Sequence, residues 1–373
     1  MRIKTITCHD VYNLGASLQA YALASFLKGL GHDVQIIDYK PVYLRHYRLM
    51  GIPENSRFNR PGLRQAYQLA KFPGRLYERL TSKRKKAFDR FKAEYLSVTG
   101  TTYLDADSLK DAPPEADLYI AGSDQIWNPV FQNGRDPVFF LDFVPNGRKK
   151  ISYAASFAVE TLPPEDTRRM IPWLQKLDAI AVRESSGIEL LHQMGMEGVQ
   201  VVDPVFLLPR EKWEAIAVKP DMQGYILVYD FDNNQKIKQI ALHLSAETGK
   251  KIVSLFPVEW ADEVWADAGP REFIGAIESA DIVLSNSFHA TAYSLIFQKD
   301  FYVVNRTEEI NARMKDLVGD LGLLERLVAT VPDVNTAIDY TTVILILEKK
   351  IAESKDYLIQ QTHDKLGGTY ADS

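Results

Sequence analysis

The chain has 373 residues, of which 46% are hydrophobic and 25% charged, as in ordinary globular proteins. This length is large for one hydrophobic core, so we expect two domains. The net charge of −5 excludes a protein that binds nucleic acid over its whole surface. A single cysteine, Cys8, excludes an internal disulfide and a multi-cysteine zinc site, and it indicates a reducing compartment.

The first residues, MRIKTITCHD, lack the apolar core of a signal peptide, and no later stretch is long and apolar enough for a membrane span. We therefore expect a cytoplasmic protein. Cys8 ends an apolar run typical of a strand, which favours a buried, inert thiol over a nucleophile.

The chain opens with the pattern of a β-α-β unit, which predicts strands over residues 2–7 and 33–39 and a helix over residues 17–31. Further strands are predicted within the segments 116–129, 149–157, 177–191 and 199–208. Each of these strands ends in small or polar residues, as the carboxyl-end loops of a parallel sheet do when they face a ligand crevice.

Residues 42 to about 100 differ in character, because the segment 64–92 holds ten Lys or Arg residues against Glu78 and Asp89, a local charge of +8. A solvated helical insertion is the favoured interpretation. The alternative is a surface that approaches anionic lipid or a polyanionic acceptor, since Tyr and Phe residues are interleaved with the cations.

A second alternation of strands and helices begins at residue 224 and continues to residue 305, and a long helical pattern covers residues 341–366. We predict an α/β fold of two doubly wound Rossmann-like domains, GT-B-like, with an interdomain cleft. The predicted units are an N-terminal domain over residues 1–205, a C-terminal domain over residues 206–340, and a C-terminal helix in residues 341–373 that packs back on the first domain.

No glycine-rich dinucleotide or P-loop motif is present, and the histidines show no spacing typical of metal ligands. The triplets Asp105–Asp107 and Asp230–Asp232 match a D-x-D pattern that occurs often by chance. We therefore expect neither a metal nor a cofactor.

Two polar loops in the first half could bind a ligand. In the first, Asn13, Gly15 and Gln19 lie at a helix start, where small residues let backbone N–H groups meet an anion or a sugar; a tight turn explains them equally well. The second, residues 122–129, combines a hydroxyl, a carboxylate and amides that can hold a hydroxylated ligand, although the carboxylate also suits a helix cap. Its candidate residues are Ser123, Asp124, Gln125 and Asn128.

Two further loops carry cationic or titratable groups. Arg183 follows a strand and offers a planar set of donors that matches a carboxylate or a phosphate; an ion pair with Glu184 is the alternative. Ser287 is expected to cap a helix that has His289 in its first turn. The helix dipole disfavours the cationic imidazole there and an anionic ligand restores it, whereas simple core packing is the alternative.

Together these segments resemble the polysaccharide pyruvyl transferase family, nearly from end to end. The resemblance rests on NLGASLQAYAL, DYKP, AGSDQIWNP, SYAASF, AVRESSGIELL, VVDPVFLL and GPREFIGAIESADIVLSNSFHATAYSLIFQK, in this order. It implies a GT-B-like fold and transfer of a pyruvyl group from phosphoenolpyruvate to two sugar hydroxyls, which yields a cyclic pyruvate ketal and phosphate. The acceptor is then a cell-surface polysaccharide, such as a capsule or exopolysaccharide, or its lipid-linked precursor.

The resemblance also implies that Arg183 and His289 line the donor site. Some members carry a basic residue where this chain has Ser287, so a second cation must come from elsewhere, with Arg306 and Arg271 as candidates. We expect His289 to act as the acid/base, since its intrinsic pKa lies near neutrality, and Asp124 to serve the acceptor side.

The expected partners are phosphoenolpyruvate and a sugar or lipid-linked acceptor, with membrane contact through residues 64–92 at the inner face of the membrane and no nucleic acid. Two other classes stay open at this point. One is a nucleotide-sugar-dependent glycosyltransferase of GT-B fold, and the other is a non-catalytic glycan-binding relative.

Overall fold

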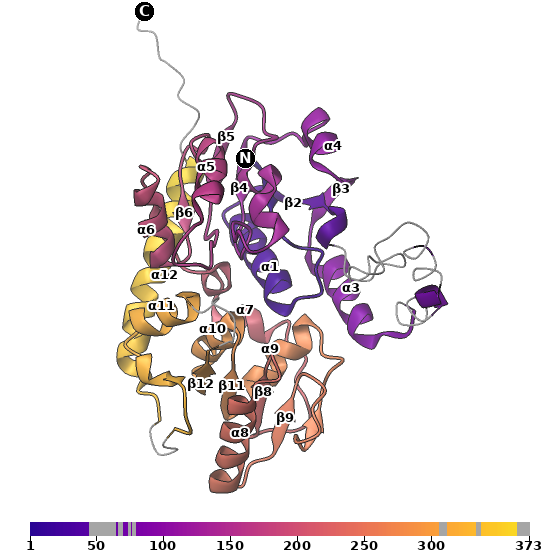
Figure 1. Ribbon diagram of the computed structural model, residues 1–373, viewed down its shortest axis with the longest axis vertical. Coiled ribbons are helices and arrows are strands. Elements are labelled where there is room, and N and C mark those ends of the chain that lie inside the picture. Colours follow the sequence, from indigo (N-terminus) through magenta and orange to yellow (C-terminus); the bar gives the residue numbers. More distant parts are fainter. Residues whose placement is uncertain are drawn as a thin grey trace, which may run out of the picture.

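The computed structural model describes residues 1–44, 65, 70–73, 76, 80–305, 312–332 and 337–363. It is an α/β protein in which two parallel sheets occupy the two halves of the molecule (Figure 1). The first sheet has the order β3-β2-β1-β4-β5 and contains β1 (Arg2–Ile6), β2 (Asp33–Tyr39), β3 (Val98–Tyr103), β4 (Leu118–Ala121) and β5 (Lys149–Ser152). The second has the order β10-β9-β8-β11-β12-β13 and contains β8 (Ile226–Tyr229), β9 (Ile252–Ser254), β10 (Glu263–Val264), β11 (Ile282–Ser285), β12 (Asp300–Val304) and β13 (Leu327–Val328). The predicted fold class is confirmed.

In both sheets the order in which the chain adds strands reverses at a central strand. The chain builds outward from β1 through β2 to β3 and then returns to place β4 on the other side of β1. In the second sheet it builds outward from β8 and then places β11 on the other side of β8. Open parallel sheets bind ligands at such switch points, beyond the carboxyl ends of the strands.

Helices connect the strands of both sheets. They are α1 (Leu14–Gly29), α3 (Lys83–Tyr95), α4 (Ala106–Asp111), α5 (Pro164–Leu174), α6 (Ser185–Gln193), α7 (Arg210–Glu214), α8 (Gln235–Thr248), α9 (Pro270–Ser279), α10 (Phe288–Ile296), α11 (Ala312–Asp320) and α12 (Tyr340–His363). None of the helices in the described part of the chain is both long and apolar enough to cross a bilayer.

Some elements differ from those predicted. Helix α1 begins at Leu14, three residues early, because the side chain of Asn13 accepts a hydrogen bond from the Ala16 N–H and caps it. The region 42–100, predicted as a helical insertion, contains α3 but also the edge strand β3; much of it lies outside the described residues.

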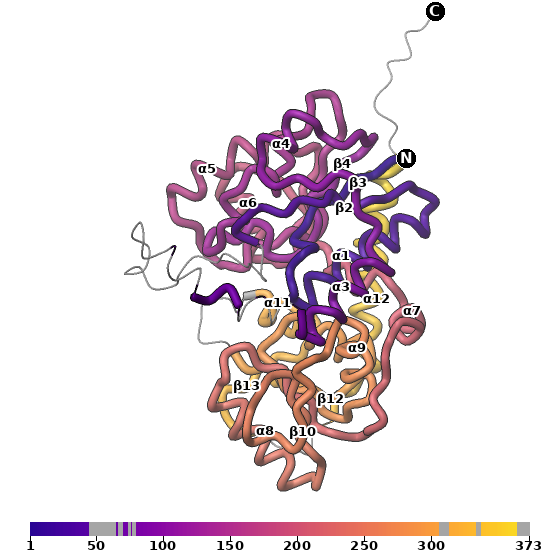
Figure 2. The backbone as a smooth tube through the Cα atoms, turned by 90° about the vertical axis from the view of Figure 1, so that its right-hand side faces the viewer, coloured from indigo at the N-terminus to yellow at the C-terminus, as the bar shows by residue number. Residues whose placement is uncertain are grey.

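Helix α12 runs along both halves of the molecule (Figures 1 and 2). Its end reaches the first sheet, where the Tyr357 hydroxyl donates to the Ser152 carbonyl and the Lys149 ammonium donates to the Gln361 carbonyl. The domain boundaries at residues 205 and 340 stay predictions, because hydrophobic packing is continuous between the two halves.

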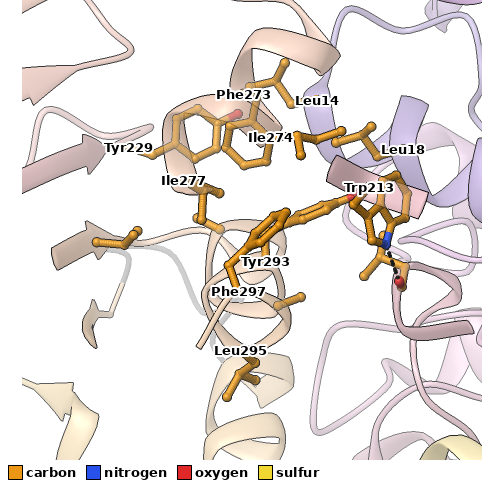
Figure 3. Packing of buried hydrophobic residues seen from close by; sticks show 14 of the residues in the cluster. Leu14, Leu18, Trp213, Tyr229, Phe273, Ile274, Ile277, Tyr293, Leu295 and Phe297 are labelled. Atoms are coloured by element: carbon orange, nitrogen blue, oxygen red, sulfur yellow. Dashed lines mark hydrogen bonds between the residues drawn. The ribbon is translucent and has the colours of Figure 1, made fainter. Parts of the chain in front are cut away.

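The largest hydrophobic cluster takes residues from both halves. The indole of Trp213 is fully buried and contacts the rings of Tyr21 on α1 and Tyr293 on α10, with ring centroids 5.7 Å and 5.0 Å apart. Its N–H donates to the carbonyl of Val205, as Figure 3 shows. The same cluster includes Leu18, so the first helix of the N-terminal half shares a core with the C-terminal half.

We predict that Trp213→Ala destabilises the whole chain by about 3–5 kcal/mol, because it opens a cavity where the two halves meet. Denaturant unfolding followed by circular dichroism measures the change. Leu345→Ala, at a side chain 65% exposed on α12, is the control and should shift stability by no more than about 0.5 kcal/mol. Equal effects of the two substitutions would show that the shared core does not hold the halves together.

Candidate functional site

A cleft of about 490 Å³ lies where the switch points of the two sheets face each other. Its walls come from the loops after β1 and β4 in one half and after β8 and β11 in the other. Predicted site residues that line it are Asn13, Asp124, Gln125, Ser287 and His289. The parallel-sheet topology therefore brings together side chains that lie far apart in the sequence.

The carboxylate of Asp203 does not line this cleft but contacts residues next to it, and it is fully buried. It accepts hydrogen bonds from the Arg183 guanidinium at 2.6 Å, the Ser123 hydroxyl at 3.1 Å and the backbone N–H of Val205 at 3.1 Å. Its Oδ2 atom also lies 3.7 Å from His289 Nε2. One carboxylate thus contacts His289, which lines the cleft, and the predicted site residues Arg183 and Ser123, which do not line it.

Arg183 is 5% exposed and has three acidic neighbours. Besides Asp203, its guanidinium lies 3.7 Å from an Asp124 oxygen and 3.8 Å from a Glu184 oxygen. Within the described residues its Nε and Nη2 atoms make no hydrogen bond. The short distance to Glu184 is compatible with the alternative ion pair. The two nitrogen atoms without a hydrogen bond are compatible with the predicted ligand contact.

His289 lies in the first turn of α10 and is 6% exposed. Its Nε2 atom makes no hydrogen bond within the described part of the chain. The other side of the ring rests on the start of α1, since a Cβ atom added to Gly15 would come within 1.9 Å of His289 Nδ1. Gly15 is therefore required for the close approach of the imidazole to the helix backbone.

The charges around His289 act in opposite directions. Burial lowers the pKa of the imidazole, and Arg183 and Arg313 lower it further, against the opposing effect of Asp203 and Asp124. The net result is a pKa below the ordinary value. The protein groups around the ring therefore keep it mainly neutral at pH 7.

Asp124 occupies the left-handed backbone region, with φ of 74°, at the start of the predicted polar loop. Burial raises the pKa of its carboxyl, but the positive charges of Arg183 and Arg313 and a backbone hydrogen bond from Gln125 help to keep the pKa below its ordinary value. The side chain is 17% exposed and lines the cleft, so an ionised carboxylate is presented to any ligand there.

Two helices begin at the cleft. Asn13 caps α1, and Ser287 caps α10 by accepting a hydrogen bond from the Ala290 N–H. Beside Ser287, the amide of Asn286 donates to Asp230 and accepts from the Phe231 N–H, which ties the loop after β11 to the loop after β8. Helix N-termini attract anions through their N–H groups and dipoles.

The other predicted residues lie behind the cleft surface. The Gln19 amide is fully buried and donates to the Thr7 hydroxyl and the Ala16 carbonyl. Asn128 is fully buried and donates to the Gln125 side chain, which does line the cleft. These contacts show Gln19 and Asn128 holding the loops in place rather than lining the cleft.

Sequence reasoning missed Arg313, which α11 places in the cleft wall. Its guanidinium lies 4.0 Å from an Asp124 oxygen, and it faces the Phe288 ring at 5.9 Å, as the guanidinium of Arg183 does at 4.3 Å. Of the predicted second cations, Arg271 points elsewhere, because its Nε atom donates to the Ile216 carbonyl. Arg306 lies outside the described residues.

Cys8 also lines the cleft, and burial raises the pKa of its thiol. The neutral thiol is a poor nucleophile, which agrees with the inert role predicted for it. In the described ranges, no three His, Cys, Asp or Glu residues are grouped so that they could hold a metal ion.

The fold and this cleft define an α/β protein of GT-B type with a crevice between its two parallel sheets. A sequence model of polysaccharide pyruvyl transferases matches residues 13–308, so the chain belongs to that family, and the resemblance seen in its motifs is confirmed. At the level of the family its function is polysaccharide pyruvyl transfer. No curated protein matches the chain in sequence.

Among solved structures the chain is similar to UDP-N-acetylglucosamine 2-epimerase from Rickettsia bellii, with a TM-score of 0.52 and 11% identity over 98% of this chain and 97% of that one. It is also similar to a putative UDP-N-acetylglucosamine 2-epimerase from Listeria monocytogenes, with a TM-score of 0.51 and 9% identity over 98% and 90% of the two chains. At such identity the likeness shows the fold alone.

We predict that Gly15→Ala displaces the His289 ring and lowers stability by about 1–3 kcal/mol, because the added methyl group overlaps the imidazole. Gly29→Ala, in the last turn of the same helix with open space around it, should instead be neutral or stabilising by up to about 1 kcal/mol. Urea unfolding of both variants and NMR signals of the His289 ring measure the effect. Equal stability of the two variants would contradict the close contact.

We also predict that Arg313→Gln raises the pKa of His289, because it removes a positive charge that disfavours the imidazolium ion. NMR titration of the histidine ring signals checks this, with the signal assigned through His289→Asn. Lys349→Gln, at an exposed ion pair on α12, is the control and should leave the titration unchanged. A His289 pKa that falls or stays constant in Arg313→Gln would refute the assigned role of Arg313.

Proposed function

We propose that this family member transfers the pyruvyl group of phosphoenolpyruvate to two hydroxyls of a sugar in a cell-surface polysaccharide or its lipid-linked precursor, forming a cyclic ketal. The observation that carries the proposal is that His289 and Arg313 line one cleft together with the starts of α1 and α10, while Arg183 packs on the Phe288 ring of the same wall. The two guanidinium groups and the backbone N–H groups at the helix starts are donors that suit a small, highly charged anion.

Phosphoenolpyruvate carries a carboxylate and a phosphate, so its site needs donors for both. The N-terminus of α10 and the guanidinium of Arg313 are on the cleft surface. The guanidinium of Arg183 packs on the Phe288 ring of the cleft wall, and its Nε and Nη2 atoms make no hydrogen bond within the described residues, although buried donors of this kind are normally satisfied. In the proposal an anionic oxygen of the donor satisfies them.

The bound donor also changes the protonation of His289. The surrounding protein groups favour the neutral imidazole, but a nearby trianion favours the charged form, so we expect the ring to take up a proton when the donor binds. The imidazolium then delivers this proton to the methylene carbon of the donor, while a sugar hydroxyl attacks C2. Asp124, an ionised carboxylate in the same cleft, receives the proton of that hydroxyl.

The second half of the reaction restores both groups. The bond between C2 and the phosphate oxygen breaks, and phosphate leaves with its bonding electron pair. A second hydroxyl of the same sugar attacks C2 and closes the ketal ring, and its proton passes to the neutral imidazole of His289. The proton on Asp124 leaves with phosphate, so atoms and charges balance without a redox step.

The acceptor would enter between two aromatic side chains at the edge of the cleft. Phe131 from the first half is 42% exposed and Phe231 from the second is 37% exposed, and both line the cleft. Exposed aromatic faces beside a few polar groups are typical of sites for partly apolar ligands such as sugar rings.

The test mixes the purified chain with phosphoenolpyruvate and a panel of β-galactosyl and N-acetylhexosaminyl acceptors and measures phosphate release and ketal formation. We expect activity with at least one acceptor and a loss of about 100-fold or more in His289→Asn, because general acid–base catalysis contributes about that much. His192→Asn, at an exposed histidine outside the cleft, should retain full activity.

A thermal-shift screen separates the proposal from its rivals. Phosphoenolpyruvate should raise the melting temperature of the wild type, with a smaller shift in Arg183→Gln and Arg313→Gln. Stabilisation by nucleotide sugars alone would indicate a glycosyltransferase. Sugar binding without turnover of either donor, unaffected by His289→Asn, would indicate a non-catalytic glycan-binding protein.

A further inference from the structure

A second polar surface lies on α3, away from the cleft residues. Lys83, Lys86 and Arg90 follow the i, i+3, i+7 spacing of one helix face, and all three are exposed. Across the described part of the chain, none of these three side chains makes a hydrogen bond or an ion pair. The three positive charges are therefore presented to solvent without neutralisation.

These cations border a pocket of about 560 Å³ between α3 and the C-terminal half. Its apolar lining includes Val218 and Val264, which are 38% and 41% exposed, and the half-buried Trp265. The Trp265 ring packs edge-on against Tyr225, with centroids 5.2 Å apart, so the indole is held in place.

Contacts between α3 and the C-terminal half fix the cations above this apolar lining. The Arg84 guanidinium donates to the Ala268 carbonyl at 3.0 Å, and Gly269 meets Ala87 so closely that an added Cβ would come within 2.5 Å of the Ala87 Cβ. Figures 1 and 2 both show α3 beside α9. The arrangement is thus a preformed surface.

The other charged groups of the pocket leave an excess of positive charge. Lys219 is paired with Glu278, and Glu272 accepts a hydrogen bond from the Gly269 N–H at the start of α9. Asp267 is the remaining exposed acid of the pocket lining. Three cations without an ion pair thus face two carboxylates, Asp267 and Glu272, of which Glu272 is hydrogen-bonded to the start of α9.

We propose that this basic face, formed by Lys83, Lys86, Arg90, Val218, Val264 and Trp265, binds the surface of an anionic lipid bilayer. Each cation adds to the free energy of binding by attracting the negatively charged headgroups, and this attraction decays over the screening length of the solution. Exposed valines and a tryptophan beside them can enter the interfacial layer, where indole rings are favoured. A soluble anion would use the cations but not the exposed apolar side chains.

This inference goes beyond the proposed transfer reaction and does not depend on it. It would bring the chain to the membrane that carries a lipid-linked acceptor. Because the test measures binding without turnover, its failure would leave the proposed reaction untouched, and failure of the reaction would leave membrane binding untouched.

The test is flotation of the full chain with vesicles of phosphatidylcholine alone or mixed with phosphatidylglycerol. We expect flotation only with the anionic vesicles, a loss of affinity of about 100-fold or more in Lys83→Glu/Lys86→Glu/Arg90→Glu, and weakening at high salt. The control Lys28→Glu/Lys110→Glu/Lys349→Glu changes the net charge equally at exposed lysines on α1, α4 and α12, and it should float like the wild type.

A second measurement tests the apolar part. Anionic vesicles should shift the tryptophan emission of the wild type to shorter wavelength, and Trp265→Phe should remove most of this shift although four other tryptophans stay in the chain. Equal flotation of the two triple variants would overturn the proposal. So would displacement of the chain from vesicles by millimolar inorganic phosphate, which would mark a site for soluble anions.

Discussion

The buried carboxylate of Asp203 is the group on which the cleft depends. It binds the Arg183 guanidinium and the Ser123 hydroxyl, and it lies within 3.7 Å of His289, so three separate segments are joined at one charge. Burying such a charge is unfavourable unless partners surround it, and breaking a buried pair by removing one partner typically costs about 3–5 kcal/mol. The same contacts that satisfy Asp203 therefore determine where Arg183, Ser123 and His289 lie relative to one another.

The hydrophobic packing between the halves supports this arrangement. Trp213 contacts α1 from the first half and α10 from the second, and α10 carries His289 at its start. Because protein interiors are closely packed, a shift of the core residues around the buried helix α10 would also move its first turn. Core and site are thus coupled, although the core residues would have no contact with a ligand in the cleft.

The alternation of strands and helices made the fold predictable, since β/α periodicity and polar strand ends are local signals. His289, Asp124 and Ser287 were found in the same way, as polar residues directly after apolar runs. Asp203 was overlooked because VVDP indicates only a strand that ends in a turn, and its partners come from distant segments. Arg313 has no local signal at all, because α11 reaches the cleft only through tertiary folding. Gly15 was singled out for a ligand, but the group that needs its missing side chain is the His289 ring.

The contact between Gly15 and His289 joins the two halves at the point where the chemistry would occur. His289 belongs to the second half, and its ring packs against α1 of the first half. The ring therefore keeps this position only while the two halves stay in contact. Any hinge motion that widens the cleft to admit a large glycan would also separate the His289 ring from Gly15. His289 would then join the cleft residues of the first half only after the substrate has entered, and would leave them before the product is released. Such closure would protect a reactive donor from water during the reaction.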